Sequence, residues 1–216
     1  IQRRGLAPLS PSVWRELLNH LKPAEQTELR NLLRDRACKE WVISHNRGPM
    51  FWLRECTRTE NFQWKEQGLQ PVAPFPYKPF LDRRIDLAAL PFPHDFTDED
   101  PPDYLDVVMG YLLISKDINI PKTREMMTSW LVVGYITWYC QFYPAVGAVG
   151  QSEDDDKAMG LIKYANTLYS QQEEWQKRLH PLKHGSEEGT QHKLEWSHGS
   201  WFQGIPSGER KMASKH

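Results

Sequence analysis

The sequence has no long apolar run, few cysteines and almost no net charge. Its longest apolar stretch, Trp130–Tyr143, is interrupted by polar residues and is too short to span a bilayer, so we expect a buried helix there. The three cysteines, Cys38, Cys56 and Cys140, do not have the spacing of metal ligands. A formal net charge of −1 excludes a global electrostatic attraction to nucleic acid, so any DNA contact must come from a local patch.

What remains is the composition of an ordinary globular protein, with 39% hydrophobic and 25% charged residues. A chain of 216 residues is long enough for one substantial hydrophobic core. Neither Ile1 nor His216 looks like a natural terminus, so we expect a fragment of a longer protein. The pattern divides the chain into a helical N-terminal region, residues 1–69, and an α/β region, residues 70–216.

The N-terminal region shows helical spacing of apolar residues. A helix is predicted over Ala24–Arg36, after an earlier helical stretch that ends at Pro23, and shorter elements are predicted over Cys38–Ser44 and Met50–Thr57. Eight prolines between Gln70 and Pro102 predict loops and short turns. The acidic stretch Asp95–Asp103 at the end of this segment reads as a solvated loop.

The second region alternates helices and strands. Ser152 is a plausible N-cap of its long amphipathic helix. The order of elements favours parallel strand pairing in an α/β layer fold. The predicted elements are, in chain order, helix Asp103–Ser115, strand Asp117–Ile120, helix Ser129–Phe142, strand Ala145–Gly150, helix Ser152–Ser170, a helical continuation over Gln171–Leu179, and a hairpin of His192–Trp196 with Ser200–Ile205.

The loop Pro121–Ser129 lies between a predicted strand and a predicted apolar helix, where α/β nucleotide-binding proteins place a phosphate-binding loop. Such a loop needs backbone N–H groups at the helix start, a cation for the phosphates and a hydroxyl for Mg²⁺. The generic pattern ends in Gly-Lys-Ser/Thr, but the corresponding residues here are Met127, Thr128 and Ser129. The generic motif alone therefore favours an ordinary loop that leads into a core helix.

The surrounding residues change this interpretation. The segment Pro-Lys-Thr-Arg-Glu-Met-Met-Thr-Ser-Trp-Leu, which starts at Pro121, resembles the deviant Walker A loop of phage terminase large subunits. Three further segments resemble that family in the same order: Phe75–Leu81, Val146–Ala158 and Gly199–Gly208. The resemblance covers roughly residues 70–216 and implies a P-loop NTPase-type parallel sheet, incomplete here and preceded by a small helical region.

The resemblance also implies the ligands and the site. ATP and Mg²⁺ would bind, with Arg124 as the catalytic cation of the loop and Ser129 as the metal ligand. Arg124 is a credible substitute for the missing lysine because its planar fork can bridge two phosphate oxygens. Phe75 and Lys78 would lie near the adenine. The remaining nucleotide-binding residues implied in this way are Lys122, Thr123, Glu125, Met126, Met127 and Thr128.

As a whole, the resemblance implies the ATPase part of a DNA-packaging motor in the host cytoplasm, with no membrane contact. Its implied partners are double-stranded DNA, the portal protein, the small terminase subunit and further copies in a ring. The Walker B acids and the nuclease domain would follow His216, so we expect little or no ATP hydrolysis by this chain alone. Two alternatives stay open: a helicase-type or other P-loop nucleotide-binding protein without a packaging role, and a structural protein whose loop binds nothing.

Overall fold

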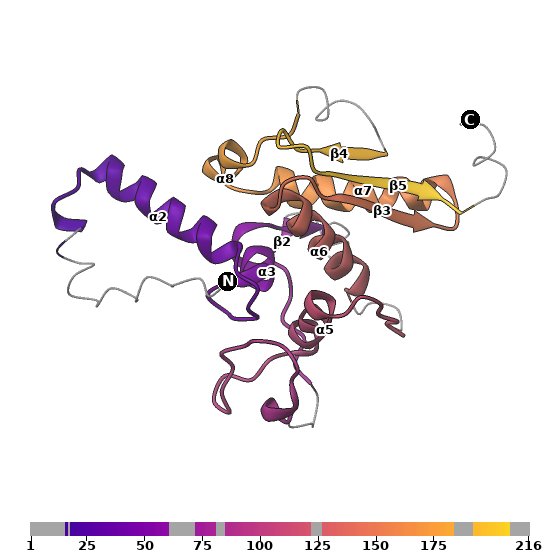
Figure 1. Ribbon diagram of the computed structural model, residues 1–216, viewed down its shortest axis with the longest axis horizontal. Helices are drawn as coiled ribbons and strands as arrows, with labels where there is room; N and C mark the ends of the chain where they lie inside the picture. Colours follow the sequence, from indigo (N-terminus) through magenta and orange to yellow (C-terminus); the bar gives the residue numbers. More distant parts are fainter. Residues whose placement is uncertain are drawn as a thin grey trace.

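The computed structural model describes residues 16, 18–60, 72–80, 85–121, 127–183 and 192–207. Figure 1 shows three parts: one long helix that projects from the body, a central group of helices, and a small sheet that packs against a further helix. The expected mixture of helices and strands, with a parallel strand pair, is confirmed.

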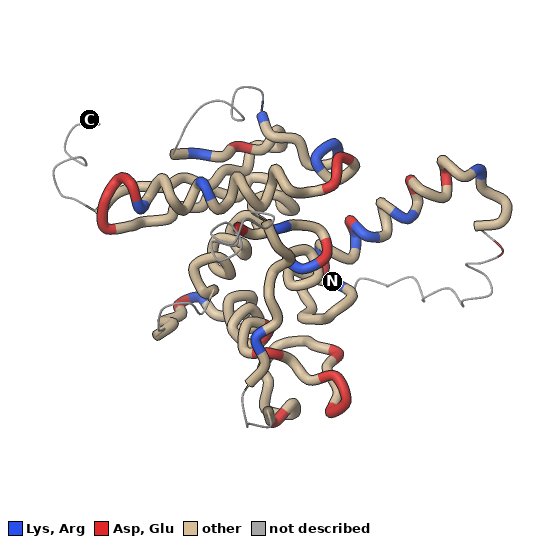
Figure 2. The backbone as a smooth tube through the Cα atoms, turned by 180° about the vertical axis from the view of Figure 1, so that it is seen from behind, with Lys and Arg blue, Asp and Glu red and all other residues tan. Residues whose placement is uncertain are grey.

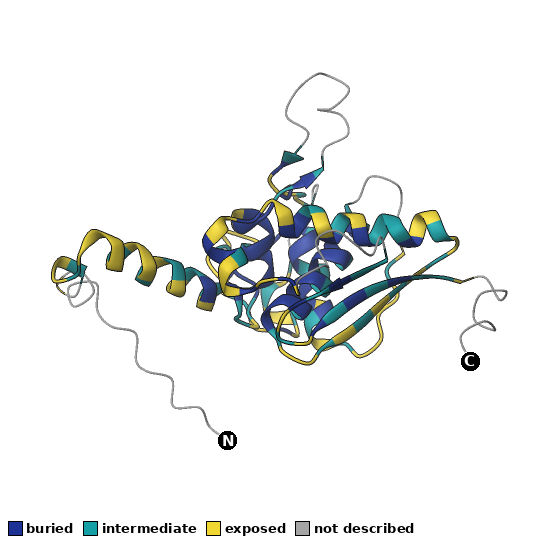
Figure 3. Cartoon of the chain, turned by 90° about the horizontal axis from the view of Figure 1, so that it is seen from above, coloured by how far each residue is buried: buried dark blue, intermediate teal, exposed yellow. Residues whose placement is uncertain are grey.

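The projecting helix is α2 (Pro23–Cys38), which matches the predicted helix closely. Proline at its first position and a capping box with Glu25 define its start. Its N-terminal part is exposed and only its C-terminal end enters the core, as Figure 3 shows. The helix predicted over Cys38–Ser44 is wrong: α2 ends at Cys38, and the chain then extends so that Ile43 forms an isolated parallel bridge with His94.

Short elements connect α2 to the central helices. Gly48, with φ of 85°, opens α3 in a left-handed conformation that suits glycine. The proline-rich segment before α5 forms only short elements among its described residues, as its prolines predict. The elements in this part are α3 (Gly48–Phe51), the π-helical turn η1 (Trp52–Cys56), strands β1 (Thr59–Glu60) and β2 (Val72–Ala73), the 3-10 turn η2 (Leu87–Ala89) and α5 (Tyr104–Ile114).

The C-terminal part contains a three-stranded sheet of order β3-β5-β4. β3 and β5 pair in parallel, with Gly147 opposite Trp201, and β4 and β5 form the predicted antiparallel hairpin. Helix α7 follows β3 and packs on all three strands, so β3, α7 and β5 form a β-α-β unit. The elements are α6 (Thr128–Phe142), β3 (Gly147–Ser152), α7 (Asp155–Ser170), α8 (Glu174–Leu179), β4 (Lys193–Glu195) and β5 (Trp201–Pro206).

Two predictions in this part are wrong. Asp117–Ile120 is not a strand, because no strand among the described residues pairs with it, and Ile118 stays 40% exposed. Ser152 is not the N-cap of α7. It remains in β3, where its carbonyl accepts from the Ser207 N–H, and the side chain of Asp154 caps the helix by accepting from the Lys157 N–H.

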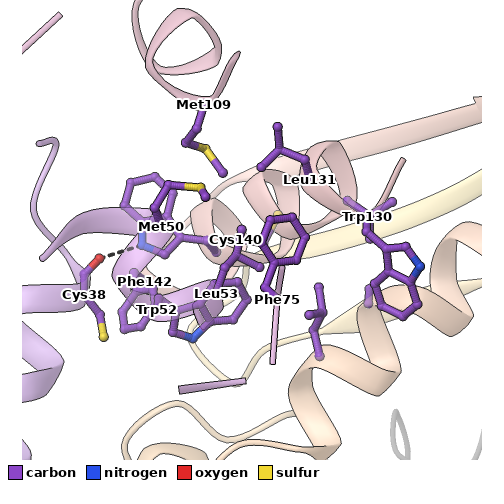
Figure 4. Close-up of a cluster of buried hydrophobic side chains, with 14 of the residues drawn as sticks. Cys38, Met50, Trp52, Leu53, Phe75, Met109, Trp130, Leu131, Cys140 and Phe142 are labelled. Atoms are coloured by element: carbon purple, nitrogen blue, oxygen red, sulfur yellow. Dashed lines mark hydrogen bonds between the residues drawn. The ribbon is translucent and has the colours of Figure 1, made fainter. Parts of the chain in front are cut away.

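A continuous hydrophobic core joins the helices to the sheet (Figure 4). Trp138 of α6 is fully buried, and its indole N–H donates to the carbonyl of Cys38 at 2.6 Å. Trp130 of α6 and Trp175 of α8 are also buried. Since α6 contacts α5, α7 and the sheet, it is the central element of the fold.

Among the described residues, helix α7 covers one face of the sheet. Phe202 and Gly204 of β5 and Gly150 of β3 face α7, and a Cβ atom built on Gly204 would lie 2.5 Å from the Ala158 carbonyl oxygen. On the opposite face, Val149 of β3 is 51% exposed. The close approach of strand and helix at Gly204 therefore fixes the distance between β5 and α7.

Candidate nucleotide-binding site

The start of α6 is the described part of the expected phosphate loop. Met127 adopts a left-handed conformation with φ of 56°, which is uncommon for a residue other than glycine. The side chain of Met127, its N-cap, makes no capping hydrogen bond. The first backbone N–H groups of a helix have no intrahelical acceptor and carry its positive dipole end, so this end of α6 can accept an anion.

The first turn of α6 is firmly held. Trp130 is buried and stacks on Tyr164 of α7, with ring centroids 4.2 Å apart. Thr128 is also buried, whereas Ser129, the expected metal ligand, is half-buried. The other expected loop residues, Lys122, Thr123, Arg124, Glu125 and Met126, lie outside the residues that the structure describes. The structure therefore places Met127, Thr128 and Ser129 of this loop at the helix start.

Phe75 and Lys78 occupy different surroundings. Phe75 is 3% exposed and belongs to the same hydrophobic cluster as Leu53 and Leu131 (Figure 4). The backbone of Lys78 is tied to the start of α5: its N–H donates to the carboxylate of Asp103 at 2.8 Å, and its carbonyl accepts from the Tyr104 N–H. The segment is thus anchored to α5, which in turn packs against α6.

The two sequence neighbours of Lys78, Tyr77 and Pro79, line a cavity of about 520 Å³. The walls combine two aromatic rings, several prolines and carboxylates. A cavity of this size and mixture is within the range of small-molecule sites. Its lining residues are Tyr77, Pro79, Phe80, Ile85, Leu87, Asp98, Asp100, Pro101, Pro102 and Asp103.

One wall of this cavity rests on a buried ionic network that the sequence did not reveal. Arg54 of η1 donates to Asp106 and to Asp103, each at 2.8 Å, and all three side chains are at most 9% exposed. The guanidinium also lies 4.2 Å from the centroid of the Tyr77 ring, a cation–π contact. The network joins η1, the Tyr77 segment and the start of α5 at one point.

The prediction that the acidic stretch Asp95–Asp103 is a solvated loop is therefore wrong at its last residue. Asp103 is fully buried and is the N-cap of α5, where it and Asp106 form a reciprocal capping box. The available signal was the spacing of these two acids directly before an apolar helix. Figure 2 shows that the acidic residues before them do gather in an exposed loop.

Two groups of this site, Asp106 and Tyr77, have raised pKa values. Burial raises the pKa of Asp106 to about 6, against the opposing attraction of Arg54 and with the help of the Asp103 charge. Burial also raises the pKa of Tyr77 to about 12, and the Asp106 charge adds to the effect. A carboxyl group with a raised pKa holds its proton in the folded state at a pH where the unfolded chain has lost it.

This shift predicts a dependence of stability on pH. The stability that protonated Asp106 contributes is complete below pH 4 and is lost as the pH rises through about 6. We expect Asp106→Asn to remove this loss. The free energy of unfolding of the variant minus that of the wild type should therefore increase by about 2–3 kcal/mol from pH 4 to pH 7. Urea unfolding of both proteins at the two pH values measures it; parallel pH profiles would contradict the assignment.

The described residues show no group of His, Cys, Asp or Glu side chains arranged to hold a metal ion, and none of their helices is long and apolar enough to cross a membrane. The comparisons with known proteins are negative: no family model matches the chain, and neither a curated protein nor a solved structure does. The candidate site therefore stands on its own geometry and on the sequence pattern around it.

Proposed function

We propose that this chain is the ATP-binding part of a viral terminase large subunit, the ATPase that drives DNA into a capsid. The observation that carries the proposal is the start of α6. This helix follows Met127 in a left-handed conformation, opens with Thr128 and Ser129, and leads directly into the parallel β3-α7-β5 unit. The resemblance of four segments to that family, in the family's order, supports it from the sequence.

The residues at the helix start would act by electrostatics. Backbone N–H groups of the first turn of α6 attract phosphate oxygens, and Lys122 and Arg124 are the nearest cations in sequence. The Ser129 hydroxyl would provide an oxygen ligand for Mg²⁺. A carboxylate at Glu125 would repel the phosphates unless it pointed away from them. Bound ATP and Mg²⁺ supply a phosphoryl group whose transfer depends mainly on neutralisation of its charge.

The cavity beside Lys78 is the part of the molecule that suits an adenine ring. Tyr77 and Phe80 offer aromatic surfaces for stacking, and the carboxylates of Asp98 and Asp100 can accept from an exocyclic amino group. Phe75, which packs in the core, would support the segment from behind. The sequence-based expectation placed Phe75 and Lys78 near the adenine, whereas the residues that line this cavity are their neighbours in sequence.

The family resemblance also supplies the proposed partners. These are double-stranded DNA, the portal protein, the small terminase subunit and, for the full-length protein in the host cytoplasm, further copies in a ring. A helicase-type or other P-loop protein would use the same helix start. If the parent reading frame continues past His216, its residues separate the two: an apolar strand that ends in Asp-Glu, followed by a cluster of Asp and Glu suited to two metal ions, favours the terminase.

Nucleotide binding tests the proposal. We expect the chain to bind ATP in the presence of Mg²⁺, and Arg124→Ala to weaken binding by about 10–100-fold, since a hydrogen bond to a charged group contributes about 1.5–3 kcal/mol. Ser129→Ala should remove the dependence on Mg²⁺. Titration calorimetry measures both, with Arg47→Ala as a control because Arg47 is exposed and belongs to the helical region. Absence of binding by the wild type would refute the nucleotide site.

A further inference from the structure

Two of the three cysteines lie against each other in the core. Cys38 ends α2 and Cys56 ends η1, and their Sγ atoms are 3.7 Å apart. Both are free thiols, and both are buried, with exposures of 0% and 3%. Cys140 is also buried, but its thiol donates a hydrogen bond to the backbone carbonyl of Trp201.

A cation accompanies one of these thiols. The Arg34 guanidinium lies 3.9 Å from the Cys56 Sγ, while Glu173 and the Trp175 ring hold the guanidinium from the other side. The hydrogen bond from Cys38, helped by the Arg34 charge, lowers the pKa of Cys56. The same contact and burial raise the pKa of Cys38. The pair thus combines one thiol with a lowered pKa, beside a cation, and one with a raised pKa, as in an attacking and resolving pair.

We propose that Cys38 and Cys56 are an oxidation site, at which a hydroperoxide converts the two thiols into a disulfide that ties the end of α2 to η1. The Cys56 thiolate attacks one peroxide oxygen, which forms a sulfenic acid and releases the other oxygen as hydroxide or alkoxide. The Cys38 sulfur then attacks the sulfenic sulfur, its proton leaves with the sulfenic oxygen as water, and the S–S bond forms. The peroxide is reduced by two electrons, and the two sulfurs lose them.

The geometry allows this bond with small movements. The sulfurs must approach from 3.7 Å to about 2 Å, which rotation of the two side chains can supply. The Arg34–Glu173 pair that covers Cys56 is partly exposed, with side-chain exposures of 35% and 52%, so its opening admits a small oxidant. The new bond would close a loop between positions 38 and 56 and restrict the unfolded chain.

Oxidation of the folded chain by hydrogen peroxide, followed by alkylation and intact-mass analysis, tests the proposal. We expect the loss of two hydrogens, one remaining alkylatable thiol, a Cys38–Cys56 peptide on mapping, and a rise in Tm of about 5–10 °C that dithiothreitol reverses. Cys140→Ser, the matched control, should form the same disulfide. Cys38→Ser should stop at the sulfenic acid of Cys56.

A second variant keeps the test independent of folding defects at the cysteines. Arg34→Gln should slow disulfide formation by about 3–10-fold without changing the product, because it removes the charge beside Cys56. Retention of three alkylatable thiols by the folded wild type, or a disulfide that includes Cys140, would overturn the proposal. An Arg34→Gln protein that oxidises at the wild-type rate would overturn the role given to Arg34.

Discussion

Replacing Arg54 with methionine is expected to lower the free energy of unfolding by about 3–5 kcal/mol. The substitution keeps most of the buried side-chain volume but leaves Asp103 and Asp106 without their shared cation, and both are at most 1% exposed. Two uncompensated carboxylates in the core cost more than the lost contacts of the arginine itself. Thermal and urea unfolding measure the effect, with an expected fall in Tm of about 6–20 °C.

Two further variants isolate the cause. Arg47→Met is the matched control: Arg47 also pairs with acids but is 45% exposed, so its loss should cost at most about 1 kcal/mol. Asp106→Asn in the Arg54→Met background should recover part of the stability, because it removes one of the unpaired charges. If Arg54→Met behaves like Arg47→Met, the buried network does not support this part of the fold.

Replacing Gly204 with alanine is expected to destabilise the protein by about 2–3 kcal/mol. The new Cβ would lie 2.5 Å from the backbone oxygen of Ala158, so α7 and β5 must move apart. The matched control is Gly160→Ala in α7, where a new Cβ meets no atom within 4 Å. That substitution should stabilise the helix by about 0.5–1 kcal/mol, since alanine favours a helix over glycine.

Urea unfolding of the two glycine variants measures the difference, and hydrogen exchange of the β5 amides reports where it arises. The β3-α7-β5 unit is the part of the fold on which the proposed nucleotide site depends, because α6 leads into it. Equal stabilities of Gly204→Ala and Gly160→Ala would show that α7 does not pack on β5 as closely as the structure has it.

The long helices and the hairpin could be predicted from the sequence because their signals are local. Apolar spacing located α2, α5 and α6 to within a few residues, and the turn at Ser197–Gly199 located the hairpin. The strand predicted at Asp117–Ile120 failed for a non-local reason. The β-branched residues Ile118 and Ile120 are enough to produce a strand-like sequence pattern. A strand also needs a neighbouring strand to pair with, and the described residues provide none.

In the candidate site, too, local sequence patterns located some residues and missed those that only tertiary packing brings together. The loop sequence located the start of α6, where Thr128 and Ser129 lie, because a strand-like stretch before a helix is a local pattern. Arg54 could not be found in this way: it lies 49 positions from Asp103, and nothing near it in the sequence is acidic except Glu55. Its partners meet it only through the packing of η1 against the start of α5.

The parallel pairing of β3 with β5 has a consequence for the order of folding. Each residue of β3 meets a partner 54 positions later in the chain, whereas the partners in the β4–β5 hairpin are close together. Closing so long a loop is slow compared with forming a helix or a hairpin. During synthesis at about 5–20 residues per second, β3 must wait roughly 3–10 seconds for β5, and the completed α7 roughly 2–6 seconds. Until β5 is made, α7 lacks part of the surface that buries its apolar side, because α6 and β3 cover only the rest, and in that interval a chaperone would have reason to bind it.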